Sequence, residues 1–142
     1  MRRTADWPNR SFSPREKLEL GLEILFAYTR ARWWLWRTDL PRTVSALRSG
    51  TQSDQAASED PERAGARLGR VVGRTLRHLP FDSRCLMRSL VLTSLLARRG
   101  INSSLVIAVQ SEAAFEAHAW VESRGVALLP PAEEPFRRIV EI

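Results

Sequence analysis

The chain has 142 residues, of which 44% are hydrophobic, enough for one domain with a buried core or for one core with a helical extension. A single cysteine excludes an internal disulfide, and with only two histidines it argues against a Cys/His zinc site, so no cofactor is expected. The net charge of +6 suits an acidic partner, such as nucleic acid, anionic lipid or an acidic peptide. No signal-peptide pattern opens the chain, and its apolar stretches are interrupted by charges. We therefore expect a cytoplasmic protein without stable membrane insertion.

The first predicted helix runs from Pro14 to Arg37. The sequence Ser13-Pro14-Arg15-Glu16 is typical of a helix start with a capping box. A row of residues then recurs at helical spacing: Leu18, Leu22, Leu25, Thr29, Trp33 and Trp36. The run from Trp33 to Trp36 cannot point inward as a whole. We expect it to pack onto the core or a neighbouring helix, the alternative being an interfacial membrane anchor or a partner-docking surface.

Two more helices are predicted before the cysteine. A short one runs from Pro41 to Arg48, and after a polar loop a third runs from Pro61 to His78, with an apolar side made of Leu68, Val71, Thr75 and Leu76. Five arginines of the third helix are spaced four, three, four and three residues apart, so they form one stripe: Arg63, Arg67, Arg70, Arg74 and Arg77. This arginine stripe is either a solvated face or a surface that binds an acidic peptide or a phosphate backbone.

The stretch 82–122 contains the residues on which the other predictions depend. Asp82 or Ser83 caps a central helix with Cys85 in its first turn, which ends near Gly100. A buried strand follows at 104–109. From Phe115 the chain alternates, which places four residues on one face of a second strand: Glu116, His118, Trp120 and Glu122. A short return strand is predicted at 126–129 and a last strand at 136–142.

A cysteine at a helix start and a histidine on a strand can supply a nucleophile and its base. The unpaired N–H groups and the dipole of the helix stabilise a thiolate at Cys85, and the same N–H groups can receive the oxyanion of a tetrahedral intermediate. His118 can take the thiol proton and later give it to a leaving amine. On spacing alone, purely structural roles remain open for both residues.

Four segments occur in a characteristic order: Cys85-Leu86-x-Arg88-Ser89-Leu90, Leu95-Leu96-x-Arg98-Arg99-Gly100, Leu105-Val106-Ile107-x-Val109 and Ala117-His118-Ala119-Trp120-Val121-Glu122. With them, the chain from about Arg67 to Glu122 resembles the leader peptidases of lasso-peptide biosynthesis, members of the transglutaminase-like cysteine protease superfamily. The resemblance implies an α+β fold, in which N-terminal helices precede a core of a cysteine-bearing helix packed on a small antiparallel sheet. It also implies an N-terminal extension and linker at 1–60 and a peptidase core at 61–142.

The resemblance further implies that Cys85 is the nucleophile and His118 the base. It places the third member, an aspartate, on the strand after the histidine, where this chain has Leu129 and Pro130. Glu133 is the nearest acid on the loop that follows, and a Cys–His dyad is the alternative. Glu122 shares the face of His118 but lies roughly 7 Å along the strand, too far for a direct hydrogen bond. The glutamine that papain-like enzymes place upstream of the cysteine is missing, so the second oxyanion donor is unidentified.

The remaining predictions concern partners. Trp120 either packs or contacts substrate, and Arg88 either steers an acidic leader or pairs with Glu122. The arginine stripe, through Arg67, Arg70 and Arg74, is expected to contact the precursor leader peptide or a separate leader-recognition protein, because no recognition domain is visible.

The expected function is a cysteine peptidase that frees the core's N-terminal amine for a separate ATP-dependent lasso cyclase. One alternative is a catalytically degenerate homologue acting as a basic scaffold in the maturation complex. The other is nucleic-acid binding, which the lack of aromatic-basic interleaving outside the first helix disfavours.

Overall fold

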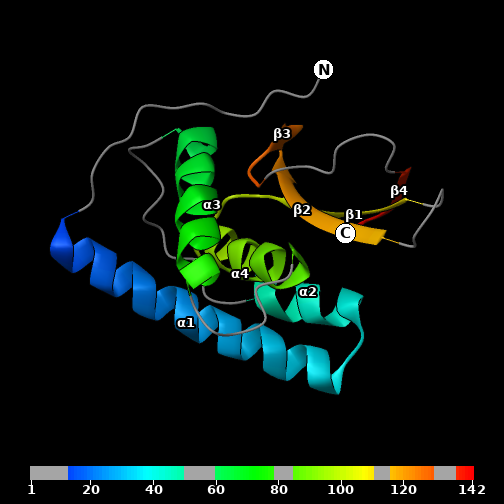
Figure 1. Cartoon of the computed structure of the whole chain (residues 1–142), viewed down its shortest axis with the longest axis horizontal. Helices are drawn as coiled ribbons and strands as arrows, with labels where there is room; N and C mark the ends of the chain where they lie inside the picture. Colours follow the sequence, from blue (N-terminus) through cyan, green and yellow to red (C-terminus); the bar gives the residue numbers. More distant parts are fainter. Residues whose placement is uncertain (1–12, 50–59, 79–84, 111–115, 130–136) are drawn as a thin grey trace.

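The computed structural model describes residues 13–49, 60–78, 85–110, 116–129 and 137–142. These residues form four helices and a four-stranded antiparallel sheet (Figure 1), so the predicted α+β class is confirmed. The elements are α1 (Pro14–Arg37), α2 (Leu40–Arg48), α3 (Pro61–His78), α4 (Cys85–Arg98), β1 (Ser104–Gln110), β2 (Glu116–Ser123), β3 (Val126–Ala127) and β4 (Arg137–Glu141).

α4 is the central helix of the fold. Every residue from Ser89 to Leu96 is buried, and α4 contacts α1, α2 and α3 as well as β1 and β2. Figure 1 shows it between α1 and α2 on one side and the sheet on the other. The helix ends as predicted at Gly100, whose φ of +68° suits glycine, with the Ile101 N–H donating to the Leu96 carbonyl at 2.9 Å. Residues of α1, α2 and α4 belong to one hydrophobic cluster. The predicted division of the chain into an extension at 1–60 and a core at 61–142 stays a prediction.

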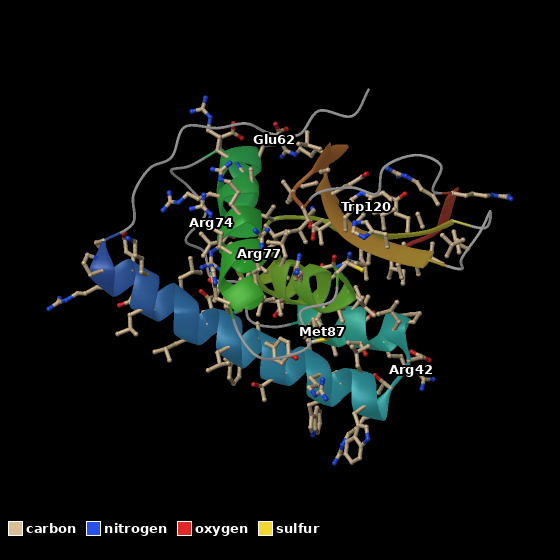
Figure 2. All side chains as sticks on the ribbon, in the orientation of Figure 1. Arg42, Glu62, Arg74, Arg77, Met87 and Trp120 are labelled. Carbon is tan, nitrogen blue, oxygen red and sulfur yellow. The ribbon has the colours of Figure 1, made fainter. Side chains whose placement is uncertain are left out.

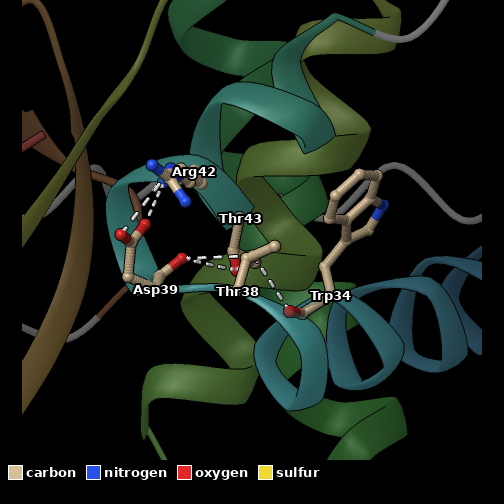
Figure 3. A network of polar contacts seen from close by, with 5 residues as sticks. All are labelled: Trp34, Thr38, Asp39, Arg42 and Thr43. Atoms are coloured by element: carbon tan, nitrogen blue, oxygen red, sulfur yellow. Dashed lines mark hydrogen bonds and ion pairs between the residues drawn. The ribbon is translucent and has the colours of Figure 1, made fainter.

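The starts of α1 and α2 follow from side-chain caps. Ser13 Oγ accepts from the Glu16 N–H at 3.3 Å, and Glu16 Oε2 accepts from the Ser13 N–H at 2.7 Å, which is the predicted capping box. At the turn shown in Figure 3, Asp39 Oδ1 accepts from the Arg42 N–H at 3.0 Å. This cap starts α2 at Leu40, one residue before its predicted start.

α1 packs on the core through one side and exposes the other. The buried residues are Leu20, Ile24, Ala27, Tyr28 and Ala31, whereas the row that the spacing picked out is exposed. Trp34 and Leu35 pack against the core, but Trp33 and Trp36 are 46% and 82% exposed. The prediction that the tryptophan run packs inward is therefore wrong for those two residues. Since both sides of α1 are apolar, its periodicity could not identify the buried side.

The sheet has the strand order β3-β2-β1-β4. In the β1–β2 pair, Ala108 lies opposite His118 and Val106 opposite Trp120, so these four residues share one face. β3 pairs only with residues 122 and 123 and is shorter than the predicted return strand at 126–129. The next residue, Leu128, still donates its N–H to the Val121 carbonyl of β2 at 2.9 Å, but its own carbonyl lies against Gly69 of α3.

α3 approaches the end of β3 at a glycine. A Cβ added to Gly69 would lie 2.0 Å from the Leu128 carbonyl oxygen, far inside van der Waals contact, so only glycine fits there. A Cβ added to Gly73, one turn later, would meet nothing within 4 Å. Of the predicted apolar side of α3, Leu68 and Leu76 are buried.

Gly69→Ala is expected to destabilise the protein, because the new methyl group forces α3 away from Leu128. Overpacking of this kind costs about 1–3 kcal/mol. The matched control, Gly73→Ala, is expected to stabilise α3 by about 0.5–1 kcal/mol through helix propensity. Urea denaturation followed by circular dichroism measures both changes, and equal midpoints for the two variants would contradict the close approach.

Candidate active site

Cys85 is the first residue of α4 and is only partly buried, although most of the helix behind it is buried. The first N–H groups of a helix have no intrahelical acceptors, and the helix dipole adds positive potential at the same end. The thiol therefore lies where a negative charge on sulfur or on a bound oxyanion is stabilised. The structure confirms the predicted position of Cys85 in the first turn.

The Cys85 sulfur lies at the outer edge of β2. Its Sγ accepts from the Ala119 N–H at 3.4 Å and lies 4.0 Å from the Ala117 carbonyl oxygen. Backbone groups two residues apart in a strand point the same way, so those of Ala117, Ala119 and Val121 lie at one edge of β2. At this edge the Val121 carbonyl accepts from the Leu128 N–H at 2.9 Å. Because β3 pairs only with residues 122 and 123, the sulfur takes the edge positions that a longer β3 would have paired.

His118 lies between the two residues whose backbone meets the sulfur. Its ring is partly buried and stacks on Trp120, with ring centroids 6.1 Å apart and planes inclined by 29°. The structure therefore brings the Cys85 sulfur to the backbone on either side of His118, and the pairing of the two side chains as nucleophile and base stays a prediction. A thiol and an imidazole in neighbouring positions can act together as nucleophile and base.

A polar network, buried at Trp120 and Glu122, continues along the same face of the sheet. The Trp120 Nε1–H donates to Glu122 Oε1 at 2.8 Å, and Arg138 Nη2 donates to the same oxygen at 2.5 Å. Glu122 is 7% exposed, so its carboxylate depends on these donors in place of water. The Arg138 guanidinium also lies 5.7 Å from the centre of the Trp120 ring. The network fixes Trp120 and, through the stacked rings, restricts the imidazole of His118.

Trp120 packs inside the protein. Its side chain is 2% exposed and lies at the sheet in Figure 2. This burial favours packing over the substrate contact that the sequence left open.

The third catalytic position is only partly described. Leu129, at the place where the family resemblance puts an aspartate, is a buried apolar residue. Glu133 falls within 130–136, outside the described residues, as do the predicted cap at 82–83 and Phe115. The involvement of Glu133 therefore stays a prediction.

Arg88 lies one turn after Cys85 and is partly buried. Among the described residues its buried Nε has no hydrogen-bond partner. Glu122, the intramolecular partner considered from the sequence, binds Trp120 and Arg138 instead. Of the two alternatives for Arg88, contact with an acidic leader thus remains as a prediction.

The arginine stripe covers the side of α3 opposite to its buried residues. Arg74 and Arg77 are exposed and are labelled on α3 in Figure 2, whereas Arg67 and Arg70 are partly buried. Arg63 pairs with Asp60 at 3.8 Å. The geometry is compatible with a solvated face and with a surface for an acidic partner.

Arg138 is the site residue that sequence reasoning missed. It belongs to β4, which pairs with β1 and not with β2, so no local pattern connects residue 138 with residue 122. Pairing between strands distant in sequence was the missing information. In the part of the chain that the structure describes, no group of three or more His, Cys, Asp or Glu side chains is placed to hold a metal ion. No described helix has the length and apolarity needed to cross a membrane.

Comparison with known proteins gives one match. A family model described as the transglutaminase-like superfamily matches residues 25–141, a range that contains Cys85, His118 and the network around Glu122. No curated protein and no solved structure matches the chain significantly.

Arg138→Met is expected to destabilise the fold by about 1–3 kcal/mol, because it leaves the buried Glu122 carboxylate without its cation. The matched control is Arg137→Met, which removes an exposed neighbour. Adding Glu122→Gln to Arg138→Met should recover part of the loss, since the neutral amide needs no cation. Equal unfolding free energies for the two arginine variants in urea denaturation would contradict the network.

Proposed function

Since this chain belongs to the transglutaminase-like superfamily, which includes cysteine peptidases, we propose that it removes the leader peptide from a ribosomally synthesised lasso-peptide precursor. The observation that carries the peptidase proposal is the Cys85 Sγ, which accepts from the N–H of Ala119, the residue next to His118, at 3.4 Å. The ordered motifs around these two residues support the lasso leader as the substrate class.

In the proposed first half-reaction, His118 takes the proton of the Cys85 thiol, and the thiolate attacks the carbonyl carbon of the last leader residue. The new C–S bond moves an electron pair onto the carbonyl oxygen, which the N–H groups at the start of α4 stabilise. When the oxyanion collapses, the C–N bond breaks and His118 gives its proton to the departing amine. The core peptide leaves with a free N-terminus, and the leader remains as a thioester on Cys85.

The second half-reaction returns the enzyme to its starting state. His118 takes a proton from water, whose oxygen attacks the thioester carbonyl, and the C–S bond breaks. The leader leaves as a free acid and Cys85 is protonated again. The whole cycle balances without a cofactor. The released amine is the group that a separate ATP-dependent cyclase would join to a side-chain carboxyl group.

The orientation of the imidazole follows from its packing. The stacked Trp120 ring, held by Glu122, limits rotation of the His118 side chain. A thiolate–imidazolium pair needs an orienting carboxylate less than a serine nucleophile does, so a dyad suffices for the proposal. Glu133 remains the proposed third member.

One observation favours a second candidate function. Leu129 is apolar and buried where the family resemblance expects an aspartate. A homologue that lost its third catalytic group could serve as a basic scaffold that binds the precursor and the other maturation proteins. Such a scaffold would bind the leader but release no cleaved product.

The arginine stripe is the proposed contact for the leader or for the separate recognition protein. Arg70, Arg74 and Arg77 have no ion-pair partner among the described residues, so their charges are available to an acidic chain.

Cys85→Ala is expected to abolish leader removal, because no other residue supplies the thiolate. His118→Ala should lower the rate by about 10²–10⁴-fold through loss of the base. His78→Ala, which removes the other histidine at the exposed end of α3, is the control and should cleave at the wild-type rate. Mass spectrometry of a mixture with precursor and recognition protein gives the products, and circular dichroism confirms folding. If the Cys85→Ala variant cleaves at the wild-type rate, the peptidase proposal is disproved. If the wild-type protein binds the leader but does not cleave it, the scaffold function is supported.

Replacing Arg67, Arg70 and Arg74 together by Gln should weaken association with the leader or the recognition protein by about tenfold and flatten its salt dependence. The control replaces three exposed arginines on other elements, Arg15, Arg42 and Arg137, and so removes the same charge. Affinities measured at low and high salt separate a local contact from the effect of net charge. If both triple variants bind alike, the stripe is only a solvated face.

A further inference from the structure

α1 exposes an apolar face on the outside of the molecule, interrupted by Thr29. We call it the outer stripe, and its residues are 41–82% exposed: Leu18, Leu22, Leu25, Phe26, Trp33 and Trp36. At 100° per residue their side chains fall within an arc of about 100°, and from first to last they extend about 27 Å along the helix. An exposed apolar row of this length on one helix marks an interaction surface rather than scattered surface residues.

The charges along the borders of the outer stripe are mostly positive. Arg15, Arg32 and Arg37 lie at its edges, with Glu19 as the acid in the same sector of the helix. Glu23 points away from it and binds Arg99 at 2.8 Å. An anionic partner would complement this border, and the net charge of +6 adds attraction at longer range.

The tryptophans of the stripe are arranged for an interface between apolar and aqueous surroundings. Trp33 and Trp36 are exposed, and the Arg37 guanidinium lies 4.5 Å from the centre of the Trp33 ring. Indole rings prefer the boundary between lipid headgroups and acyl chains, and arginines extend from there to the headgroups. Tryptophan and arginine side by side therefore fit a membrane surface.

An open hollow of about 660 Å³ lies beside the same tryptophans. Its described lining is Leu25, Tyr28, Thr29, Arg32, Trp33 and Trp36, all from α1. Apolar and aromatic side chains beside a guanidinium suit contact with acyl chains below an anionic headgroup.

We propose that α1 lies in the surface of an anionic membrane, with the outer stripe buried among the lipids and the helix parallel to the bilayer plane. A second copy of this chain fits the face less well, because it would bring arginine borders against arginine borders. Figure 1 shows α1 and the sheet on opposite sides of α4, so the sheet would lie on the side of α4 away from the lipid. The proposal does not rest on peptidase activity.

The test is cosedimentation of the whole protein with vesicles of phosphatidylcholine alone and of equal parts phosphatidylcholine and phosphatidylglycerol. The wild type should bind the anionic vesicles, with an affinity that falls as salt is added. Trp33→Ser with Trp36→Ser should weaken this binding about tenfold or more, because two exposed indoles no longer enter the lipid. Arg32→Gln with Arg37→Gln should lower the preference for anionic over neutral vesicles.

The matched control is Ile139→Ser with Val140→Ser, which removes two exposed apolar residues from β4 and should leave vesicle binding unchanged. Thermal unfolding checks that each variant folds, and Cys85→Ala should bind vesicles like the wild type, which separates this proposal from the peptidase. Absence of wild-type binding to anionic vesicles, or equal binding by the tryptophan variant, would overturn the proposal. If the wild type does not bind vesicles and the tryptophan variant no longer binds the recognition protein, the outer stripe is assigned to a protein partner instead.

Discussion

The contact between the start of α4 and the free edge of β2 is the constraint on which the rest of the site depends. α4 is buried along most of its length, so the core determines where its first residue lies. The short β3 leaves the Ala117 and Ala119 backbone groups at the edge of the sheet, and the Cys85 sulfur meets them there. Because unpaired backbone groups at a strand edge favour a polar partner, this contact also holds the thiol in place.

The polar network on the same strand shows how the fold holds the second residue of the pair. Glu122 is buried, and the desolvation of its carboxylate is offset by Trp120 and Arg138. A charge fixed in this way restricts the indole, and the indole stacks on His118. The His118 imidazole is thus positioned by its packing against Trp120. The Cys85 sulfur contacts the strand backbone on either side of His118.

Features that depend on local sequence signals could be predicted from the sequence. The bounds of α1 and α3 and the glycine end of α4 follow from caps, prolines and Gly100, and the place of Cys85 and His118 follows from a helix start and a period of two. Features that depend on tertiary contacts were not predictable. The buried side of α1 is set by α4, because both of its sides are apolar, and the partner of Glu122 comes from a strand that pairs elsewhere. The end of β3 depends on the approach of α3 at Gly69.

The central claim is that Cys85 carries the acyl group of the leader, and trapping that intermediate tests it most directly. The protein would be mixed with precursor and recognition protein, quenched in acid within the first turnover and weighed intact. The account predicts a species heavier than the free protein by the leader less one water, localised to Cys85 by digestion and released by hydroxylamine, as expected of a thioester. The account would be contradicted if the wild type formed no such species at any time and the Cys85→Ser variant released the leader at the wild-type rate.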